Sequence, residues 1–230
     1  MNQKVKKYIP FADKISSAME LRKMWNFADC KRAMKKMRRN HLYPGFLAFG
    51  SARIPDNDPH IKEIEEVSYL CAKRILEHHK KISFITGGGP STMTAWLKPA
   101  HQLGCQASAM AITLPFEEEI TEFADKKLSF KFIHFSSRKK TMFTYAKAII
   151  IFKGGFGTMD ELYEALTLIH NGHVKKIPVF VYPADFYKDV LNFDVFLRER
   201  TINQNDADLL TFVNTKEELL NYLYKIIDEG

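Results

Sequence analysis

The sequence predicts an α/β fold, in which a doubly wound, mostly parallel sheet carries helices on both faces and follows an N-terminal helical extension. Two observations predict it. Short, continuous apolar runs alternate with longer segments of helical periodicity, which is typical of parallel strands covered on both faces. Three of the runs end in glycine turns, at the strand ends where such sheets bind ligands. These turns are Gly50-Ser51-Ala52, Gly87-Gly88-Gly89 and Gly154-Gly155.

The apolar runs place the strands, because a buried parallel strand has no polar face. We expect strands at residues 46–49, 82–86, 108–114, 131–135, 148–152, 177–182 and 210–213.

Helical periodicity and end signals place the helices between these strands. Asp58-Pro59 reads as an N-cap followed by proline at the first helical position, and Gly172 reads as a helix stop. We expect helices at residues 13–40, 59–79 and 158–171, from Pro90 to about 103, from near Ser137, and over 184–200 and 215–228.

The composition suits one large domain. The chain has 230 residues, of which 46% are hydrophobic and 27% charged, and its longest apolar runs are strand-length. A membrane span of roughly 18 residues is therefore not expected. We predict a helical extension over residues 1–43 and a single nucleotide-binding domain over residues 44–230. The three cysteines form no CxxC pair and no secretory signal follows the basic N-terminus, so a reduced, cytoplasmic location is expected.

Part of the net charge of +7 lies in one basic stretch of the N-terminal helix. Such a stretch is either a solvated helix face or a surface that attracts anions. A nucleic-acid partner is not expected, because no aromatic interleaving or known nucleic-acid motif accompanies it. The basic residues are Lys31, Arg32, Lys35, Lys36, Arg38 and Arg39.

The glycine turns favour anion binding. A glycine-rich turn that enters a helix lets backbone N–H groups approach an anion, and the helix dipole adds favourable charge. A dinucleotide fingerprint is absent, because its third glycine position holds Thr92 after the first loop and Asp160 after the second. Neither loop continues as a P-loop. The histidines show no metal-ligand spacing, so neither a metal nor a cofactor is expected.

The segment Gly154 to Glu161 has two interpretations. Thr158-x-x-Glu161 matches a capping box, in which the threonine caps the helix and the glutamate reaches back to the cap. That role leaves the three glycines Gly154, Gly155 and Gly157 unexplained, and they favour a ligand site.

Charged residues flank the same edge of the predicted sheet. Arg138 and Lys139 fall in the first turn of a helix, where the dipole disfavours cations, so they form either a surface cluster or a phosphate site. Glu161 and Glu164 share a helix face with each other and follow Asp160. They either stabilise the helix N-terminus or act on a sugar, as a base or beside an oxocarbenium-like centre.

Over roughly residues 45–183 the chain resembles the LOG family, whose members were long labelled "possible lysine decarboxylase". The residues that carry the resemblance are Gly50-Ser51-Ala52-Arg53, Thr86-Gly87-Gly88-Gly89-Pro90, Leu114-Pro115-Phe116-Glu117, Arg138-Lys139 and Gly154-Gly155-Phe156-Gly157-Thr158-Met159-Asp160-Glu161. The last of these is close to the family motif P-G-G-x-G-T-x-x-E.

The resemblance implies a Rossmann-like fold, a homodimer and phosphoribohydrolase activity. That activity cleaves the N-glycosidic bond of a cytokinin riboside monophosphate or AMP and releases the free base and ribose 5-phosphate. Decarboxylation is not expected, because no lysine stands in a pyridoxal-phosphate context. A non-catalytic nucleotide sensor or carrier of the same fold is the alternative.

The resemblance also implies roles for individual residues. Arg138 and Glu161 match the family's catalytic pair. The substrate- and phosphate-binding residues are then expected to be Gly50, Ser51, Gly87, Gly88, Gly89, Met93, Lys139, Gly154, Gly155, Gly157, Thr158 and Glu164. The chain departs from the family at Lys153, where proline is usual, and at Ser91 and Thr94, where glycine and glutamate are common. These departures bear on activity and substrate choice more than on binding.

Overall fold

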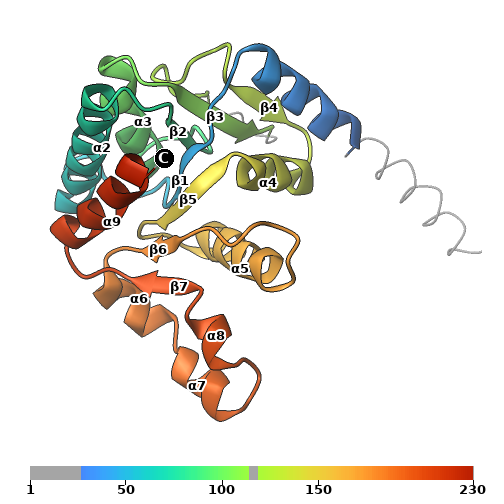
Figure 1. Cartoon of the computed structure of the whole chain (residues 1–230), viewed down its shortest axis with the longest axis vertical. Coiled ribbons are helices and arrows are strands. Elements are labelled where there is room, and N and C mark those ends of the chain that lie inside the picture. Colours follow the sequence, from blue (N-terminus) through green and yellow to red (C-terminus); the bar gives the residue numbers. More distant parts are fainter. Residues whose placement is uncertain (1–26, 114–118, 230) are drawn as a thin grey trace, which may run out of the picture.

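The computed structural model describes residues 27–113 and 119–229. Its strands form one seven-stranded sheet in the order β4-β3-β2-β1-β5-β6-β7, and every neighbouring pair is parallel (Figure 1). The predicted α/β class and parallel sheet are therefore confirmed. The strands are β1 Gly45–Phe49, β2 Ser83–Thr86, β3 Ala107–Ile112, β4 Phe130–Phe132, β5 Ala146–Ile151, β6 Val179–Val181 and β7 Leu210–Phe212.

The strand order contains one reversal, and it lies at β1. From β1 the chain adds β2, β3 and β4 in one direction, and it then returns to place β5 on the other side of β1. The carboxyl ends of β1 and β5 lie side by side, with Phe49 in register with Ile151. In doubly wound sheets such a reversal opens a crevice in which ligands bind.

Helices cover both faces of the sheet, and alternate residues of each central strand face opposite cores. Phe46 and Ala48 pack with helices α2 Pro59–Glu77, α3 Thr92–Gln102 and α9 Lys216–Glu229. Leu47 and Phe49 face the other core, with the N-terminal helix and with α4 Phe135–Thr144, α5 Phe156–His170 and α6 Ala184–Val190. Figure 1 also shows the short helices α7 Phe193–Arg198 and α8 Gln204–Ala207.

Several predicted boundaries are confirmed. Asp58 caps α2 by accepting a hydrogen bond from the His60 amide at 2.8 Å, and Pro59 is the first helical residue. Helix α5 ends at His170, and Gly172 beyond it has the positive φ of 69° that suits glycine. The beginning of the predicted helix 13–40 and the end of the predicted strand 108–114 lie outside the described residues.

Other predicted boundaries are wrong, and side-chain contacts explain two of them. The predicted strand 131–135 stops at Phe132, because the next two amides, of Ile133 and His134, donate to the Asp29 carboxylate at 2.9 and 3.3 Å. The predicted helix 184–200 is two helices, since Asn192 starts a new one by accepting from the Val195 amide at 3.4 Å.

The N-terminal helix, described over residues 27–39, is attached to the sheet by packing and by polar contacts. Ala33 and Met37 are fully buried in the core that contains β1 and β5. Lys36 donates to the carbonyls of Lys126 and Ser129 at 2.9 and 2.6 Å, so this basic residue has a structural role. The other five basic residues of the stretch are exposed, as a solvated face would be: Lys31, Arg32, Lys35, Arg38 and Arg39.

Replacing Asp29 tests how firmly this helix is attached. Asp29→Ala removes the buried acceptor of two amides and is expected to lower the free energy of unfolding by about 1–3 kcal/mol. Arg32→Ala is the control, because Arg32 is exposed and lies 3.5 Å from the same carboxylate, and its loss should cost less than about 0.5 kcal/mol. Urea unfolding of the three proteins measures both values, and equal effects of the two substitutions would contradict the assigned role of Asp29.

Candidate functional site

The glycine turns meet at the carboxyl edge of the sheet. The Ser51 amide, just beyond β1, donates to the Lys153 carbonyl beyond β5 at 2.9 Å. The Ser51 carbonyl accepts a longer hydrogen bond of 3.4 Å from the amide of Thr92, the first residue of α3. A side chain on Gly50 could not be accommodated, because its Cβ would lie 2.4 Å from the Thr92 methyl group. The turn after β1 therefore packs directly on the start of α3.

The turn after β2 is packed as closely against its neighbours as the turn after β1. A Cβ on Gly87 would lie 2.8 Å from Nη2 of Arg138 and 3.0 Å from Sδ of Met93. Gly88 has a φ of 81°, and its amide donates to the Thr86 hydroxyl at 2.9 Å. The Gly89 amide faces Met93 Sδ at 3.4 Å. The turn thus has room for a guanidinium beside its backbone only because glycine occupies position 87.

That guanidinium belongs to a buried ion pair. Arg138 of α4 donates from Nη2 to Oε1 of Glu161 on α5 at 2.9 Å and from Nε to the Met110 carbonyl of β3 at 2.9 Å. The two side chains are only 10% and 12% exposed. One arginine therefore connects two helices and a strand at the ligand edge of the sheet.

Burial changes the acidity of Glu161. Loss of water around the carboxyl raises its pKa to about 7, although the charges of Arg138 and Lys139 act in the opposite direction. A carboxyl with such a pKa carries a proton part of the time at neutral pH. Groups that exchange protons near neutrality are the ones suited to general acid–base work and to charge stabilisation.

A second ion-paired cation lies beside the first. Lys139 contacts the carboxylates of both Asp160, at 2.8 Å, and Glu164, while its own side chain is 9% exposed. Burial lowers the pKa of Lys139, but hydrogen bonds to the two carboxylates outweigh that effect and the pKa is raised. Lys139 therefore remains an ammonium group, a form that disfavours its use as the amine of a Schiff base.

Of the two interpretations of the segment from Gly154 to Glu161, the capping box is not formed. Helix α5 begins at Phe156, two residues before Thr158, and its N-cap is Gly155, which has no side chain to cap it. The Glu161 carboxylate pairs with Arg138 instead of reaching back to the helix start. Thr158 lies against the loop, where its Oγ1 would be 2.1 Å from a Cβ on Gly154.

Serine does not cap α4 either. The helix begins at Phe135 after the N-cap His134, so Arg138 is its fourth residue and its amide already donates to the His134 carbonyl at 3.1 Å. The N-cap of α3, Ser91, donates its hydroxyl to the Ile54 carbonyl at 2.7 Å and leaves the helix uncapped by a side chain. Helices α3 and α5 thus both start at the ligand edge without side-chain caps. Amides of their first turns can meet an anion, apart from the Thr92 amide that donates to the Ser51 carbonyl.

The outer part of the loop before α5 is open. A Cβ on Gly155 or Gly157 would meet no described atom within 4 Å outside the immediate chain neighbours. Phe156 between them is 98% exposed.

The structure therefore brings the residues singled out by sequence into one region at the carboxyl edge of the sheet. Glu164 belongs to this region because it pairs with Lys139. Met93 belongs to it because its sulfur packs against Gly87 in the turn after β2. Sequence reasoning missed the partner roles of Asp160 and of the Met110 carbonyl. Acidic residues at a helix start hint at the first, but no sequence signal marks a backbone carbonyl as a partner.

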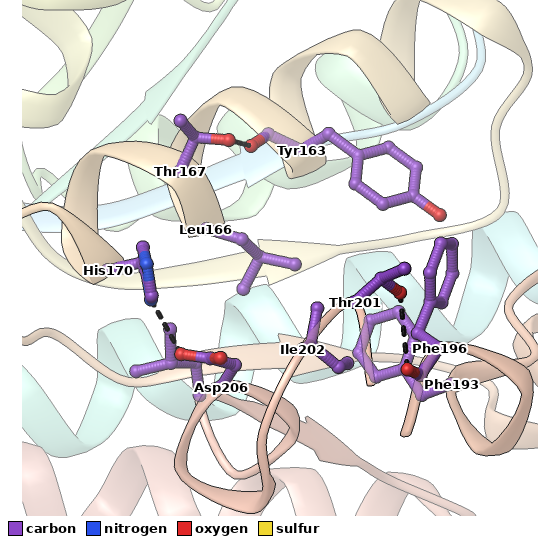
Figure 2. Close-up of a pocket in the computed structure, with 10 residues that line it drawn as sticks. Tyr163, Leu166, Thr167, His170, Phe193, Phe196, Thr201, Ile202 and Asp206 are labelled. Atoms are coloured by element: carbon purple, nitrogen blue, oxygen red, sulfur yellow. Dashed lines mark hydrogen bonds and ion pairs between the residues drawn. The ribbon is translucent and has the colours of Figure 1, made fainter. Parts of the chain in front are cut away.

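A pocket of about 380 Å³ lies elsewhere, between α5 and the segment from α7 to α8 (Figure 2). Tyr163 and Leu166 of α5 face the aromatic rings of α7, and His170 Nδ1 lies 2.6 Å from Asp206 Oδ1. None of the predicted site residues lines this pocket, so it is separate from the Arg138–Glu161 region.

The described residues contain neither a metal-binding cluster nor a helix that could span a membrane. Over residues 27–113 and 119–229, no group of three or more histidine, cysteine or acidic side chains is arranged to hold a metal ion. In the same ranges, no helix combines the length and apolar character needed to span a membrane.

Comparison with known proteins identifies the family and the fold. The family model described as "Possible lysine decarboxylase" matches residues 93–223, which is more than half of the chain. The chain is similar to the Moco carrier protein from Chlamydomonas reinhardtii, with 17% identity, a TM-score of 0.55, and coverage of 82% of this chain and 99% of that one. No curated protein matches the sequence.

Two further solved structures have the same fold. The molybdenum cofactor binding protein from Rippkaea orientalis is 18% identical at a TM-score of 0.51, with 80% of this chain and 95% of that chain covered. The protein TM1055 is 15% identical at a TM-score of 0.53, with 79% and 98% covered. Identities this low establish the fold alone.

The close packing of the turn after β2 can be tested at Gly88. In Gly88→Ala the new methyl group would lie 2.6 Å from the Ala109 Cβ, at a φ of 81°. We expect the free energy of unfolding to fall by about 2–4 kcal/mol, from left-handed strain and overpacking together. Gly104→Ala is the matched control, because Gly104 has a φ of 85° with open space around it, and it should cost only about 1–2 kcal/mol. Equal losses in thermal unfolding would show that the contact with Ala109 contributes nothing.

Proposed function

This chain belongs to the family described as possible lysine decarboxylases, the LOG family, and on that premise we propose that it hydrolyses the N-glycosidic bond of a nucleoside 5′-monophosphate. The substrate is a cytokinin riboside monophosphate or AMP. The products are the free base and ribose 5-phosphate.

The observation that carries the proposal is the buried Arg138–Glu161 pair, with its 2.9 Å contact and the raised pKa of the carboxyl. The pair lies beside the turn after β2 and contacts β3. The starts of α3 and α5 meet the ends of β1 and β5 at the same carboxyl edge of the sheet, where a doubly wound sheet binds its ligand. At this edge the Glu161 carboxyl would both contact the sugar and stabilise positive charge that develops on it. In contrast, Lys139 is held as an ammonium by Asp160 and Glu164, which argues against amine chemistry at this site.

In the proposed complex the 5′-phosphate binds at the uncapped starts of α3 and α5. Backbone amides and helix dipoles neutralise part of its charge. The ribose then lies toward Glu161. Gly155 and Gly157 leave the loop open enough for the ligand to approach the backbone closely.

In the proposed reaction the bond between the anomeric carbon and the base nitrogen breaks as positive charge develops on the ribose ring. The Glu161 carboxylate, in its ionised form, stabilises that charge and orients the sugar hydroxyls. Water adds its oxygen to the anomeric carbon, and the proton that water loses balances the proton gained by the departing base. Arg138 positions the carboxylate through their hydrogen bond.

The activity can be measured directly. We expect release of base from AMP or from N6-isopentenyladenosine monophosphate, followed by chromatography, and Glu161→Gln should reduce kcat by about 100-fold or more because the amide cannot carry negative charge. Glu77→Gln is the control, since Glu77 lies at the end of α2 and pairs with the exposed Lys73 at 3.8 Å. The wild type releasing no base from either substrate while remaining folded would end the proposal.

The pKa of Glu161 also sets the pH dependence of the reaction. Its pKa in the folded protein is raised to about 7, so the carboxyl is protonated below that pH and ionised above it. Because the proposed role needs the ionised form, kcat/KM should rise as the pH increases from about 6 to 8 and then level off. A profile measured with AMP that is flat across this range would assign the role to another group.

A second candidate is a nucleotide-binding sensor or carrier without catalysis. Arg138 and Lys139 are already paired with the protein's own carboxylates, which suits a site that binds a ligand without turning it over. Two of the similar solved structures are titled as a carrier protein and a binding protein for the molybdenum cofactor, so the fold is compatible with such a role. Thermal stabilisation by nucleotides without release of base would favour this candidate. A homodimer and a cytoplasmic location accompany both proposals.

A further inference from the structure

Lys153 lies beside the reversal of the strand order, which falls between β1 and β5. It is the second residue after the end of β5, and its carbonyl accepts the 2.9 Å hydrogen bond from the Ser51 amide beyond β1. Two residues further on, Gly155 is the N-cap of α5, and the Ser51 carbonyl in turn accepts from the first amide of α3. The backbone of Lys153 is therefore hydrogen-bonded into the junction between the starts of the two uncapped helices.

Lys153 differs from Arg138 and Lys139 in its pairing. Arg138 is paired with Glu161, and Lys139 with Asp160 and Glu164. Lys153 is half-buried and forms no ion pair within residues 27–113 and 119–229. A cation without a counter-ion among these residues is available to pair with an anionic ligand.

The surroundings of this junction contain a second polar group without a partner. The hydroxyl of Thr92, the first residue of α3, is fully buried, has no hydrogen-bond partner in the described structure, and faces Gly50, where a Cβ would lie 3.1 Å from it. Buried hydroxyls normally have a hydrogen-bond partner. A ligand that binds at this helix start and shifts the turn would supply a partner for the Thr92 hydroxyl.

His60, whose pKa is affected by the charge of Lys153, does not compete for the anion. His60 is buried against the rings of Phe152 and Tyr182. Burial, followed by the charge of Lys153, lowers the pKa of His60 to about 4, although Glu63 and Asp58 act in the opposite direction. His60 is therefore neutral at physiological pH, and the positive charge at this point of the edge comes from Lys153.

We infer that Lys153 binds the 5′-phosphate of the ligand and supplies the positive charge that Arg138 and Lys139, already paired, do not. The inference rests on the proposed function and deepens it by naming a specificity-determining residue. The ligand's phosphate lies at the junction of α3 and α5, beside the Lys153 ammonium. The site then prefers a phosphorylated sugar over the corresponding free nucleoside.

The experiment compares ligands that differ only in the phosphate. Isothermal titration calorimetry measures the dissociation constants of AMP, ribose 5-phosphate and adenosine for the wild type, Lys153→Met and Lys153→Arg. Lys176→Met is the matched control, because Lys176 is exposed and precedes β6, at the opposite edge of the sheet. Arg53→Met tests the exposed arginine in the turn after β1.

We expect Lys153→Met to weaken the binding of AMP and ribose 5-phosphate by about 10- to 100-fold, as expected for loss of a charge-assisted contact, and to leave adenosine unchanged. Lys153→Arg should retain most of the affinity and Lys176→Met all of it. Thermal unfolding without ligand should be the same for the wild type and Lys153→Met, since Lys153 forms no ion pair in the described structure.

Two results would overturn the inference. One is an unchanged affinity of Lys153→Met for AMP and ribose 5-phosphate while the wild type hydrolyses AMP, which leaves the proposed function intact. The other is a loss of phosphate affinity in Arg53→Met but not in Lys153→Met, which moves the phosphate to the turn after β1. The proposed function fails separately if the wild type binds AMP through Lys153 but releases no base.

Discussion

The buried pair of Arg138 and Glu161 is the interaction on which the rest of the site depends. It holds α4 and α5 against each other, and through the Met110 carbonyl it attaches both to β3. Gly87 must lack a side chain for the guanidinium to lie where it does. Removing one partner of such a buried pair typically costs about 3–5 kcal/mol, because the other charge is left without compensation. The same burial raises the pKa of Glu161 toward neutrality, so one contact serves both stability and chemistry.

The distribution of charge around this pair distinguishes the internal framework of the site from the part that faces a ligand. Arg138 and Lys139 have carboxylate partners in the described structure, whereas the ammonium of Lys153 forms no ion pair there. The starts of α3 and α5 have no side-chain caps. The overall charge of +7 has little bearing on this arrangement, since much of the basic stretch on the N-terminal helix is simply exposed. Local pairing, rather than net charge, decides which cations are available to a phosphate.

The fold by itself supports more than one function. Proteins 15–18% identical to this chain share its architecture, and two of them are titled for the molybdenum cofactor. Because unrelated activities recur on one architecture, the choice between hydrolase and carrier depends on the site residues. The protonation of Glu161 and the availability of its carboxylate to a sugar are the physical properties that separate the two.

The sequence alone determined the order of elements, because buried parallel strands must be apolar throughout and helix ends carry local signals such as Asp58-Pro59 and Gly172. It also placed the glycine turns at one edge, which follows from parallel strands. It could not determine how side chains pair. Thr158 and Glu161 satisfy the capping pattern locally, yet Glu161 bonds to an arginine 23 positions earlier that reaches it only when α4 and α5 pack together. The end of β4 was likewise decided by Asp29, about a hundred residues away. Such contacts depend on tertiary packing, which no local pattern encodes.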